Sequence, residues 1–261
     1  LEDGLECKLF SRSSRGVVLT DEGRLLYDHV SEAFEALNEG EEKLKRSIEL
    51  GVGQLKIGVS STLCKYMLLP YLKEFIHRNP HISISIECQS TNETLKLLDD
   101  DKIDIGLIGK PASLKTFNFY YLDNIEDIFV TTKDYLRNLS ARGVKKSEIL
   151  QNSTLMLLDK GNMTRKYIDD YLQENQIHVK DSIDISNMDL LIDFAKIGVG
   201  VACVIKSIVS KELADGTLIE IPLGIPIHKR EVGFAYKESS KLSTSLQTFI
   251  KFYESYTPED F

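Results

Sequence analysis

The sequence predicts an α/β protein with two lobes, preceded by a long helix and a short hairpin. Strands and helices alternate in two successive runs, over residues 54–131 and 132–233. Such alternation is typical of parallel sheets built from right-handed βαβ units. Residues 21–50 instead carry one continuous helical repeat. With 261 residues, 42% of them hydrophobic, the chain is long enough to bury the cores of two modest domains.

Residues 9–23, "LFSRSSRGVVLTDEG", predict a small basic hairpin followed by the start of a helix. The net charge of the whole chain is −8, which argues against a protein that binds nucleic acid over its entire surface. A local basic patch is still compatible with that charge. Taken alone, the hairpin is best interpreted as a solvated turn.

The segment over residues 21–50 predicts a single helix. Thr20 can cap its N-terminus, and Asp21 and Glu22 place negative charge in the first turn, where the helix dipole favours it. A narrow stripe with heptad spacing then predicts self-association through this helix. The alternative is a surface helix that lies on the globular body. The residues of the stripe are Leu26, Val30, Ala33, Leu37, Gly40, Leu44 and Ser47.

Two glycines over residues 51–53 predict a hinge, and the alternation of strands and helices starts after them. The expected strands cover residues 54–61, 82–90, 103–109, 117–122, 126–132, 153–159, 181–186, 199–205, 217–223 and 230–238. The expected helices cover residues 66–80, 91–100, 164–176, 188–198 and 243–256. We therefore expect a first lobe over 54–131, a second lobe over 132–233 and a return to the first lobe over 234–261. No sequence repeat relates the two lobes.

Three polar loops at strand-to-helix junctions are candidates for ligand binding. Folds of this kind bind ligands beyond the carboxyl ends of their strands, where the N–H groups of helix starts are unpaired. Ordinary helix capping is the alternative for each loop: Ser186 with Asp189 looks like a capping box. The expected ligand contacts are Ser60, Ser61, Thr62, Lys110, Thr164, Ser186, Asn187 and Met188.

The charges near these loops favour a small anionic or zwitterionic ligand. Lys65, Lys110 and Arg165 lie close to the loops in sequence and add positive potential to that of the helix N-termini. Tyr66 and Met67 are candidates for an apolar floor, which keeps an aromatic acid open, and both fit equally well in the core.

Several kinds of site are not indicated. Cys7, Cys64, Cys88 and Cys203 are widely spaced and show no metal-ligand pattern, so we expect neither zinc nor a structural disulfide. No set of nucleophile and base, carboxylate pair or phosphate loop emerges, so neither catalysis nor a cofactor is expected. No apolar run approaches the ~18 residues of a membrane span, which leaves the cytoplasm as the expected location.

The opening of the chain resembles the LysR-type transcriptional regulators. Their signature is an LE pair, then LF, Arg, a hydrophobic-Leu-Thr and a glycine, and "FAKIGVGVACVI" is similar to their second internal signature. Two departures stand out: Glu6 replaces a glycine common in the family, and Ile205-Lys206 stands where a proline is common. The residues in register are Leu1, Glu2, Leu9, Phe10, Arg12, Arg15, Val18, Leu19, Thr20 and Gly23.

The resemblance implies a ligand-responsive regulator of transcription that binds double-stranded operator DNA and forms a homodimer or homotetramer. Residues 1–20 would be the wing that ends a winged helix-turn-helix, truncated before the base-reading part, and 21–50 the dimerisation helix. The two lobes would form a regulatory domain like a periplasmic binding protein, closing on a small effector. The implied DNA contacts are Arg12, Ser13, Ser14, Arg15 and Thr20, and the implied dimer contacts are Leu26, Val30, Ala33, Leu37 and Leu44.

Three other classes are weighed against this one. A solute-binding protein would share the two lobes but has no use for the long helix or for "RSSRGVVLT". A thiol redox sensor would need two partnered cysteines, and the spacing of the cysteines suggests none. An enzyme would need a catalytic set that the sequence does not show.

Overall fold

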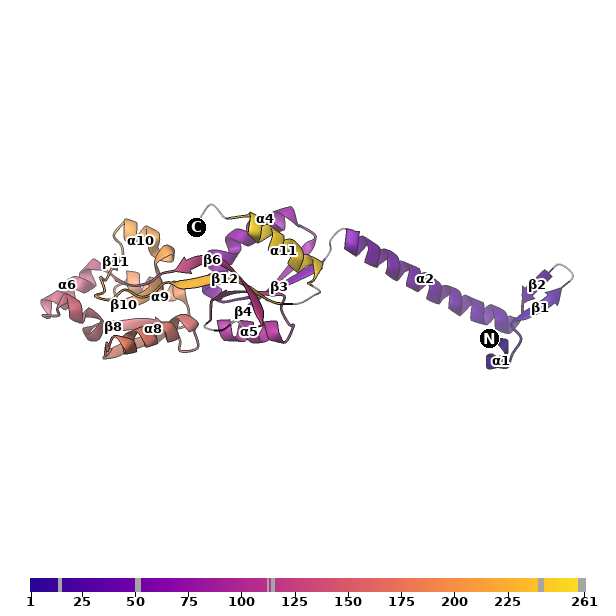
Figure 1. Cartoon of the computed structure of the whole chain (residues 1–261), viewed down its shortest axis with the longest axis horizontal. Helices are drawn as coiled ribbons and strands as arrows, with labels where there is room; N and C mark the ends of the chain where they lie inside the picture. Colours follow the sequence, from indigo (N-terminus) through magenta and orange to yellow (C-terminus); the bar gives the residue numbers. More distant parts are fainter. Residues whose placement is uncertain (14–15, 50–52, 112, 114–115, 239–241, 258–261) are drawn as a thin grey trace. The chain divides into compact units, whose positions relative to one another are not determined.

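The computed structural model of the chain describes residues 1–13, 16–49, 53–111, 113, 116–238 and 242–257. The chain divides into two compact units, Leu1–Gly53 and Gln54–Phe261, whose helices and strands are labelled in Figure 1. Within the described ranges, no helix is long and apolar enough to cross a membrane.

The first unit contains the predicted hairpin. A short helix, α1 (Glu2–Leu5), precedes the antiparallel strands β1 (Phe10–Ser13) and β2 (Gly16–Leu19) and the helix α2 (Asp21–Glu49). Glu6 adopts a left-handed φ of 54° at the end of α1. This turn is one that glycine adopts freely. Because Glu6 has a Cβ, the left-handed conformation costs roughly 1 kcal/mol relative to glycine.

Helix α2 begins at the predicted cap. Thr20 Oγ1 accepts a hydrogen bond from the Gly23 N–H at 2.9 Å. The Thr20 N–H donates to the Leu9 carbonyl at 3.0 Å, and a Cβ at position 23 would lie 2.0 Å from that same oxygen. Only glycine permits this close approach of the helix to the hairpin.

The exposed stripe of α2 differs slightly from the predicted one. Tyr27, Val30, Phe34 and Leu37 are 43–65% exposed and recur at gaps of 3, 4 and 3 residues. Leu26 is half-buried and Ala33 is exposed, so two predicted positions are each one residue away from the large side chains. The side chain of Leu44 and residues 51–52 of the predicted hinge lie outside the described residues.

The second unit has one five-stranded sheet in each lobe (Figure 1). The first sheet has the order β4-β3-β5-β12-β6, from β3 (Gly53–Val59), β4 (Ile82–Cys88), β5 (Ile105–Gly109), β6 (Phe117–Ile125) and β12 (Arg230–Lys237). Strands β3 and β5 are parallel, whereas β12 is antiparallel to both β5 and β6. The helical segments of this lobe are α3 (Ser61–Leu63), the π-helix η1 (Cys64–Leu68), α4 (Leu69–Arg78), α5 (Thr91–Asp99) and α11 (Thr244–Ser255).

The second sheet has the order β11-β7-β10-β8-β9. Its strands are β7 (Asp127–Thr131), β8 (Thr154–Leu158), β9 (Asp181–Ile185), β10 (Val201–Ile205) and β11 (Ile219–Glu220). The helical segments of this lobe are α6 (Lys133–Ala141), η2 (Lys146–Glu148), α7 (Ile149–Asn152), α8 (Met163–Glu174), α9 (Met188–Lys196), η3 (Lys206–Val209) and α10 (Ser210–Ala214).

The predicted lobe boundaries at 131 and 233 are wrong by a few residues. Strand β7 pairs with β10 and β11 in the second sheet, although the sequence placed it in the first lobe. Strand β12 pairs along its whole length with the first sheet. The chain therefore enters the second lobe at Glu126 and has returned by Arg230. Because β7 and β12 are antiparallel to their neighbours, both sheets are mixed rather than purely parallel.

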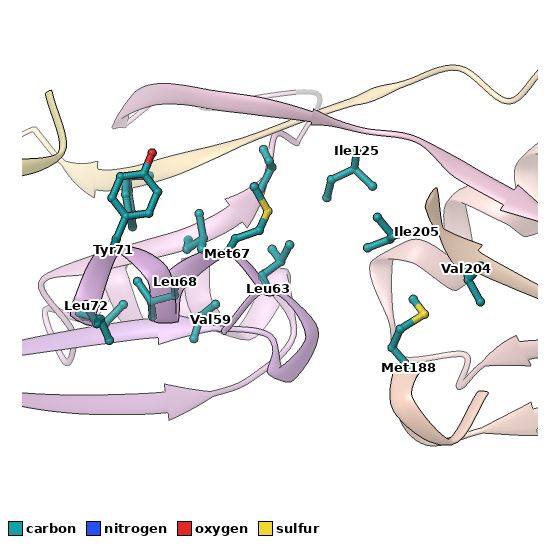
Figure 2. Close-up of a cluster of buried hydrophobic side chains, with 14 of the residues drawn as sticks. Val59, Leu63, Met67, Leu68, Tyr71, Leu72, Ile125, Met188, Val204 and Ile205 are labelled. Atoms are coloured by element: carbon teal, nitrogen blue, oxygen red, sulfur yellow. The ribbon is translucent and has the colours of Figure 1, made fainter. Parts of the chain in front are cut away.

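The largest hydrophobic core cluster continues across the boundary between the lobes. In the first lobe, Phe75 of α4 and Phe234 of β12 each pack edge-to-face against Phe249 of α11. Figure 2 shows Leu63 and Met67 on the first-lobe side, with Ile205 and Met188 on the second-lobe side. Part of the boundary between the lobes is therefore apolar.

Candidate functional site

A cleft of about 510 Å³ lies between the two lobes. Its walls come from the loops after β3, β4 and β5, the start of α8, and the segment that enters β12. The lining residues are Ser60, Thr62, Leu63, Ser90, Thr91, Gly109, Lys110, Pro111, Ile125, Asn162, Met163, Thr164, Tyr167, Ile205, Lys229, Arg230 and Glu231. The cleft thus lies beyond the carboxyl ends of parallel strands, where open α/β folds bind ligands.

Polar side chains in the cleft also cap the helices that start there. Ser60 Oγ accepts from the Leu63 N–H and Ser90 Oγ accepts from the Glu93 N–H, each at 3.3 Å. Asn162 Oδ1 accepts from the Thr164 N–H at 2.8 Å. A serine that accepts one hydrogen bond keeps its own proton for donation. Capping and ligand contact are therefore compatible roles for the same residue.

Arg230 is the most firmly held charge in the cleft. Its Nε and Nη2 donate to Asp127 Oδ2 and Oδ1 at 2.8 and 3.0 Å, and Nη2 also reaches Thr164 Oγ1 at 3.2 Å. The guanidinium lies 5.2 Å from the ring centre of Tyr167. Its Nη1 has no hydrogen bond within the described part of the chain. Arg230 therefore keeps one nitrogen available to a ligand.

Asp127 is buried beneath this arginine. Its side chain has no exposed surface, whereas Arg230 is 15% exposed. Burial raises the pKa of the Asp127 carboxyl, and the charge and hydrogen bonds of Arg230 oppose that rise. The pair joins β7 to β12, the two strands at which the chain passes between the lobes.

The other cations of the cleft are paired as well. Lys110 Nζ lies 2.5 Å from Glu231 Oε2, and both side chains are more than 40% exposed. Lys229 Nζ lies 3.0 Å from Glu126 Oε2. The hydrogen bond from Lys229 lowers the pKa of Glu126, against the effect of burial. Each cation that lines the cleft therefore has an acidic partner from the protein itself.

The structure brings half of the predicted ligand residues to this cleft. Ser60, Thr62, Lys110 and Thr164 line it. Ser61, Ser186, Asn187 and Met188 do not line it.

The residues after β9 have other roles. Asn187 Oδ1 caps α9 by accepting from the Leu190 N–H at 2.9 Å. Met188 is 2% exposed and belongs to the core. Its apolar side chain is accounted for by packing, and its role as a ligand contact stays a prediction.

Arg165 and Lys65, the other cations near the loops, bind protein groups outside the cleft. Arg165 is buried and donates to the Leu158 carbonyl at 2.9 Å and to Asp169 at 2.8 Å. Lys65 Nζ lies 2.6 Å from Asp189 Oδ1. Neither lines the cleft, and Tyr66 and Met67 line a second cavity instead.

Sequence reasoning missed Arg230 and Tyr167, which line the cleft, and Asp127, which holds Arg230 in place. Arg230 and Asp127 lie 103 residues apart, so no local pattern connects them. Tyr167 lies on the same helix as Thr164 and reads as an ordinary amphipathic position. Ser90 is the exception, because Ser90 with Glu93 has the spacing of a capping box directly after a strand.

Two cysteines far apart in sequence are neighbours in the structure. The pKa of the Cys64 thiol is raised by burial and then by the charge and hydrogen bond of Cys88. Cys64 is half-buried, Cys88 is exposed, and both are free thiols. Cys203 is buried, and its burial raises the pKa of that thiol well above its ordinary value. The sequence did not anticipate the contact between Cys64 and Cys88.

The wing residues are only partly described. Arg12 is exposed on β1, and Ser13 ends that strand. Ser14 and Arg15 lie outside the described residues. The Thr20 hydroxyl donates to the Lys8 carbonyl at 2.6 Å while it caps α2. Its proton is therefore engaged within the hairpin.

Two lobes joined by two crossover connections, with a polar cleft between them, define a binding protein for small molecules. The family model of the LysR substrate binding domain matches residues 49–257. The chain belongs to this family and is a LysR-type transcriptional regulator with an effector-binding domain. The predicted family and fold class are confirmed.

Relatives along the whole chain agree with this assignment. The uncharacterized HTH-type transcriptional regulator YeiE of Escherichia coli (strain K12) is 24% identical over 253 residues, covering 97% of this chain and 84% of that protein. The HTH-type transcriptional activator CmpR of Synechocystis is 24% identical, covering 94% of this chain and 79% of that protein. These relatives are regulators of transcription, not enzymes.

Solved structures share the fold. A full-length OxyR variant from Pseudomonas aeruginosa has a TM-score of 0.71 at 19% identity, covering 96% of this chain and 86% of that chain. The Synechocystis CcmR regulatory domain in complex with 2-PG has a TM-score of 0.64 at 19% identity, covering 77% of this chain and 95% of that chain.

Proposed function

We propose that the cleft between the lobes binds a small anionic or zwitterionic metabolite and that this ligand controls the regulator. The observation that carries the proposal is Arg230, which is fixed by Asp127 and Thr164 and keeps Nη1 available in a cleft that both lobes line. A guanidinium with a fixed plane suits a carboxylate or phosphate oxygen. The solved CcmR domain holds 2-PG in the same fold, which supports a ligand of this size.

The pairing of charges refines the ligand class. Lys110 and Glu231 form an exposed ion pair, so a ligand can separate the two side chains at small cost in free energy. A ligand with both signs of charge replaces both partners: its anionic group takes Lys110, and its ammonium group takes Glu231. The pairing therefore favours a zwitterion over a simple anion.

Titration calorimetry against amino acids and matched carboxylic acids tests this proposal. We expect Lys110→Met and Thr164→Val each to weaken binding of the active compound about tenfold, the effect of losing one charged or buried hydrogen bond. Lys96→Met is the matched control, because Lys96 pairs with Glu93 on the exposed side of α5. Equal affinities for all three variants and the parent chain would remove the cleft from consideration.

We further propose that the wing contacts operator DNA. Arg12 is exposed and suited to a phosphate oxygen. With an operator fragment, Arg12→Ala is expected to lower the slope of log K against log salt by about one unit. An unchanged slope would show that Arg12 makes no phosphate contact.

The exposed stripe of α2 supports self-association. Four large apolar side chains on one face of a helix favour burial against a second copy. We expect Phe34→Lys to shift the chain toward the monomer in sedimentation velocity, whereas Glu35→Lys on a neighbouring face leaves its mass unchanged.

We propose that the protein works in the cytoplasm, where its DNA lies, and that it catalyses no reaction and needs no cofactor.

A further inference from the structure

A second cavity, of about 370 Å³, also lies between the lobes. Thr62, Leu63, Tyr66, Met67 and residues 123–125 line it from the first lobe, and Ile205, Ser207, Ile208 and Ser210 line it from the second. This volume lies within the range of sites for small molecules. The cavity shares Thr62, Leu63, Ile125 and Ile205 with the polar cleft, so these residues form a common wall.

The body of the second cavity is apolar. Leu63, Met67, Ile125 and Ile205 are each at most 9% exposed. Leu63, Met67 and Ile125 come from the first lobe and Ile205 comes from the second, and Figure 2 shows these side chains near one another at the boundary between the lobes. A thioether and three branched aliphatic side chains fit an aromatic or aliphatic ligand body, and the flexible methionine can adapt to its shape.

The electrostatics of this cavity are opposite to those of the cleft. Among its described lining residues, Asp123 is charged and no lysine or arginine is present. Asp123 Oδ1 accepts from the Asn124 N–H at 2.7 Å, and Oδ2 has no hydrogen bond in the described part of the chain. Lysines adjacent in sequence are engaged elsewhere: Lys65 with Asp189, and Lys206 with Glu126 and Glu220.

We propose that this cavity is a second ligand site, specific for a small hydrophobic amine. The ammonium group binds the Asp123 carboxylate, and the apolar body fills the space between Met67 and Ile205. Because both lobes line the cavity, a bound amine stabilises the observed arrangement of the lobes. The argument for the amine does not rest on the metabolite proposed for the polar cleft, although four residues line both cavities.

Three probes of one shape test the charge preference: phenethylamine, 2-phenylethanol and 3-phenylpropanoate. In calorimetric titrations of the chain, phenethylamine should bind a few-fold more tightly than the alcohol, because its ammonium group pairs with Asp123, a carboxylate that is exposed and therefore partly screened by solvent. The propanoate should show no binding here. Absence of phenethylamine binding, or equal affinity for the amine and the propanoate, overturns the proposal.

Matched variants locate the site. Asp123→Asn should reduce the preference for amine over alcohol to about onefold, because the carboxylate is gone, whereas Asp134→Asn, at an exposed partner of Arg137, should preserve it. Ser207→Phe should abolish binding by filling the cavity from its exposed rim, and the equally exposed Ser140→Phe on α6 should not.

Thr164→Val distinguishes the two cavities, because Thr164 lines only the polar cleft. Phenethylamine should bind this variant as it binds the parent chain. If Thr164→Val weakens the amine and Asp123→Asn does not, the amine occupies the cleft and the second site is refuted.

Discussion

Removing Arg230 tests whether the ion pair beneath the cleft holds the lobes together. Arg230→Met keeps most of the side-chain length but leaves the Asp127 carboxylate, which has no exposed surface, without its bidentate partner. Breaking a buried ion pair by removing one member costs about 3–5 kcal/mol. Set against a typical total stability of about 5–15 kcal/mol, this is a large loss. We expect such a loss in the free energy of unfolding at neutral pH.

The loss should depend on pH with a defined sign. Burial already raises the pKa of Asp127, and without Arg230 that pKa rises further. The folded variant then holds a proton that the unfolded chain releases above its ordinary pKa of about 3.9. Stability therefore falls as pH rises through the window between the unfolded and folded values. Arg230→Met should be closer to the parent chain at pH 5 than at pH 7.5.

Urea denaturation followed by circular dichroism at both pH values measures these effects. The double variant Arg230→Met with Asp127→Asn should recover most of the loss, because no buried charge is left uncompensated. Lys229→Met is the control, since that lysine is 60% exposed and its ion pair is worth about 1 kcal/mol or less. A loss below about 1 kcal/mol for Arg230→Met, or a double variant no more stable than the single, refutes the reasoning.

Other predictions concern packing, pH and thiols. Gly233→Ala should lower the free energy of unfolding by about 3 kcal/mol, because its Cβ would lie 2.1 Å from the Tyr120 carbonyl oxygen; an unchanged urea midpoint contradicts this. Hydrogen bonds from Lys65 and Tyr66 lower the pKa of Asp189, so Asp189→Asn should be less stable than the parent chain at pH 7 and equal to it at pH 2.5. A difference that persists at the lower pH counts against that contact. Iodoacetamide should modify exposed Cys88 before buried Cys203, as mass spectrometry of peptides will show, and the reverse order would contradict the burial of Cys203.

The elements were predictable because each leaves a local pattern, whereas their sheet membership was not. Residues 126–132 read as a buried strand, and the structure has β7 there. No turn signal separates β6 from β7, since Glu126 alone lies between Ile125 and Asp127. The strand therefore gives no local sign that it pairs with β10, which follows it by about 70 residues. Pairing at that distance is set by tertiary packing.

The site was predictable only where a local rule applies. Ser60 and Thr164 follow strands that lie inside their sheets and line the cleft, and Ser90 also lines it although it follows the edge strand β4. Asn187 follows β9, which is at the edge of its sheet, and its loop does not reach the cleft. The rule that ligands bind at the carboxyl ends of strands does not by itself say which of these loops face the other lobe, because β4 and β9 are both edge strands and only the loop after β4 lines the cleft. That choice depends on the strand order and on how the two lobes pack. No local pattern in the chain supplies that order.

Arg230 lies where a ligand of the cleft would contact a strand that crosses between the lobes. The chain passes between the lobes twice, at β7 and at β12, and the pair of Asp127 and Arg230 joins these two strands. A ligand that accepts a hydrogen bond from Nη1 would bind the same guanidinium whose Nε and Nη2 bind Asp127. It also shares Leu63 and Ile205 with any occupant of the second cavity. A ligand shifts the populations of two lobe arrangements only if it binds one of them more tightly than the other. Contacts to groups at the boundary between the lobes can provide that difference.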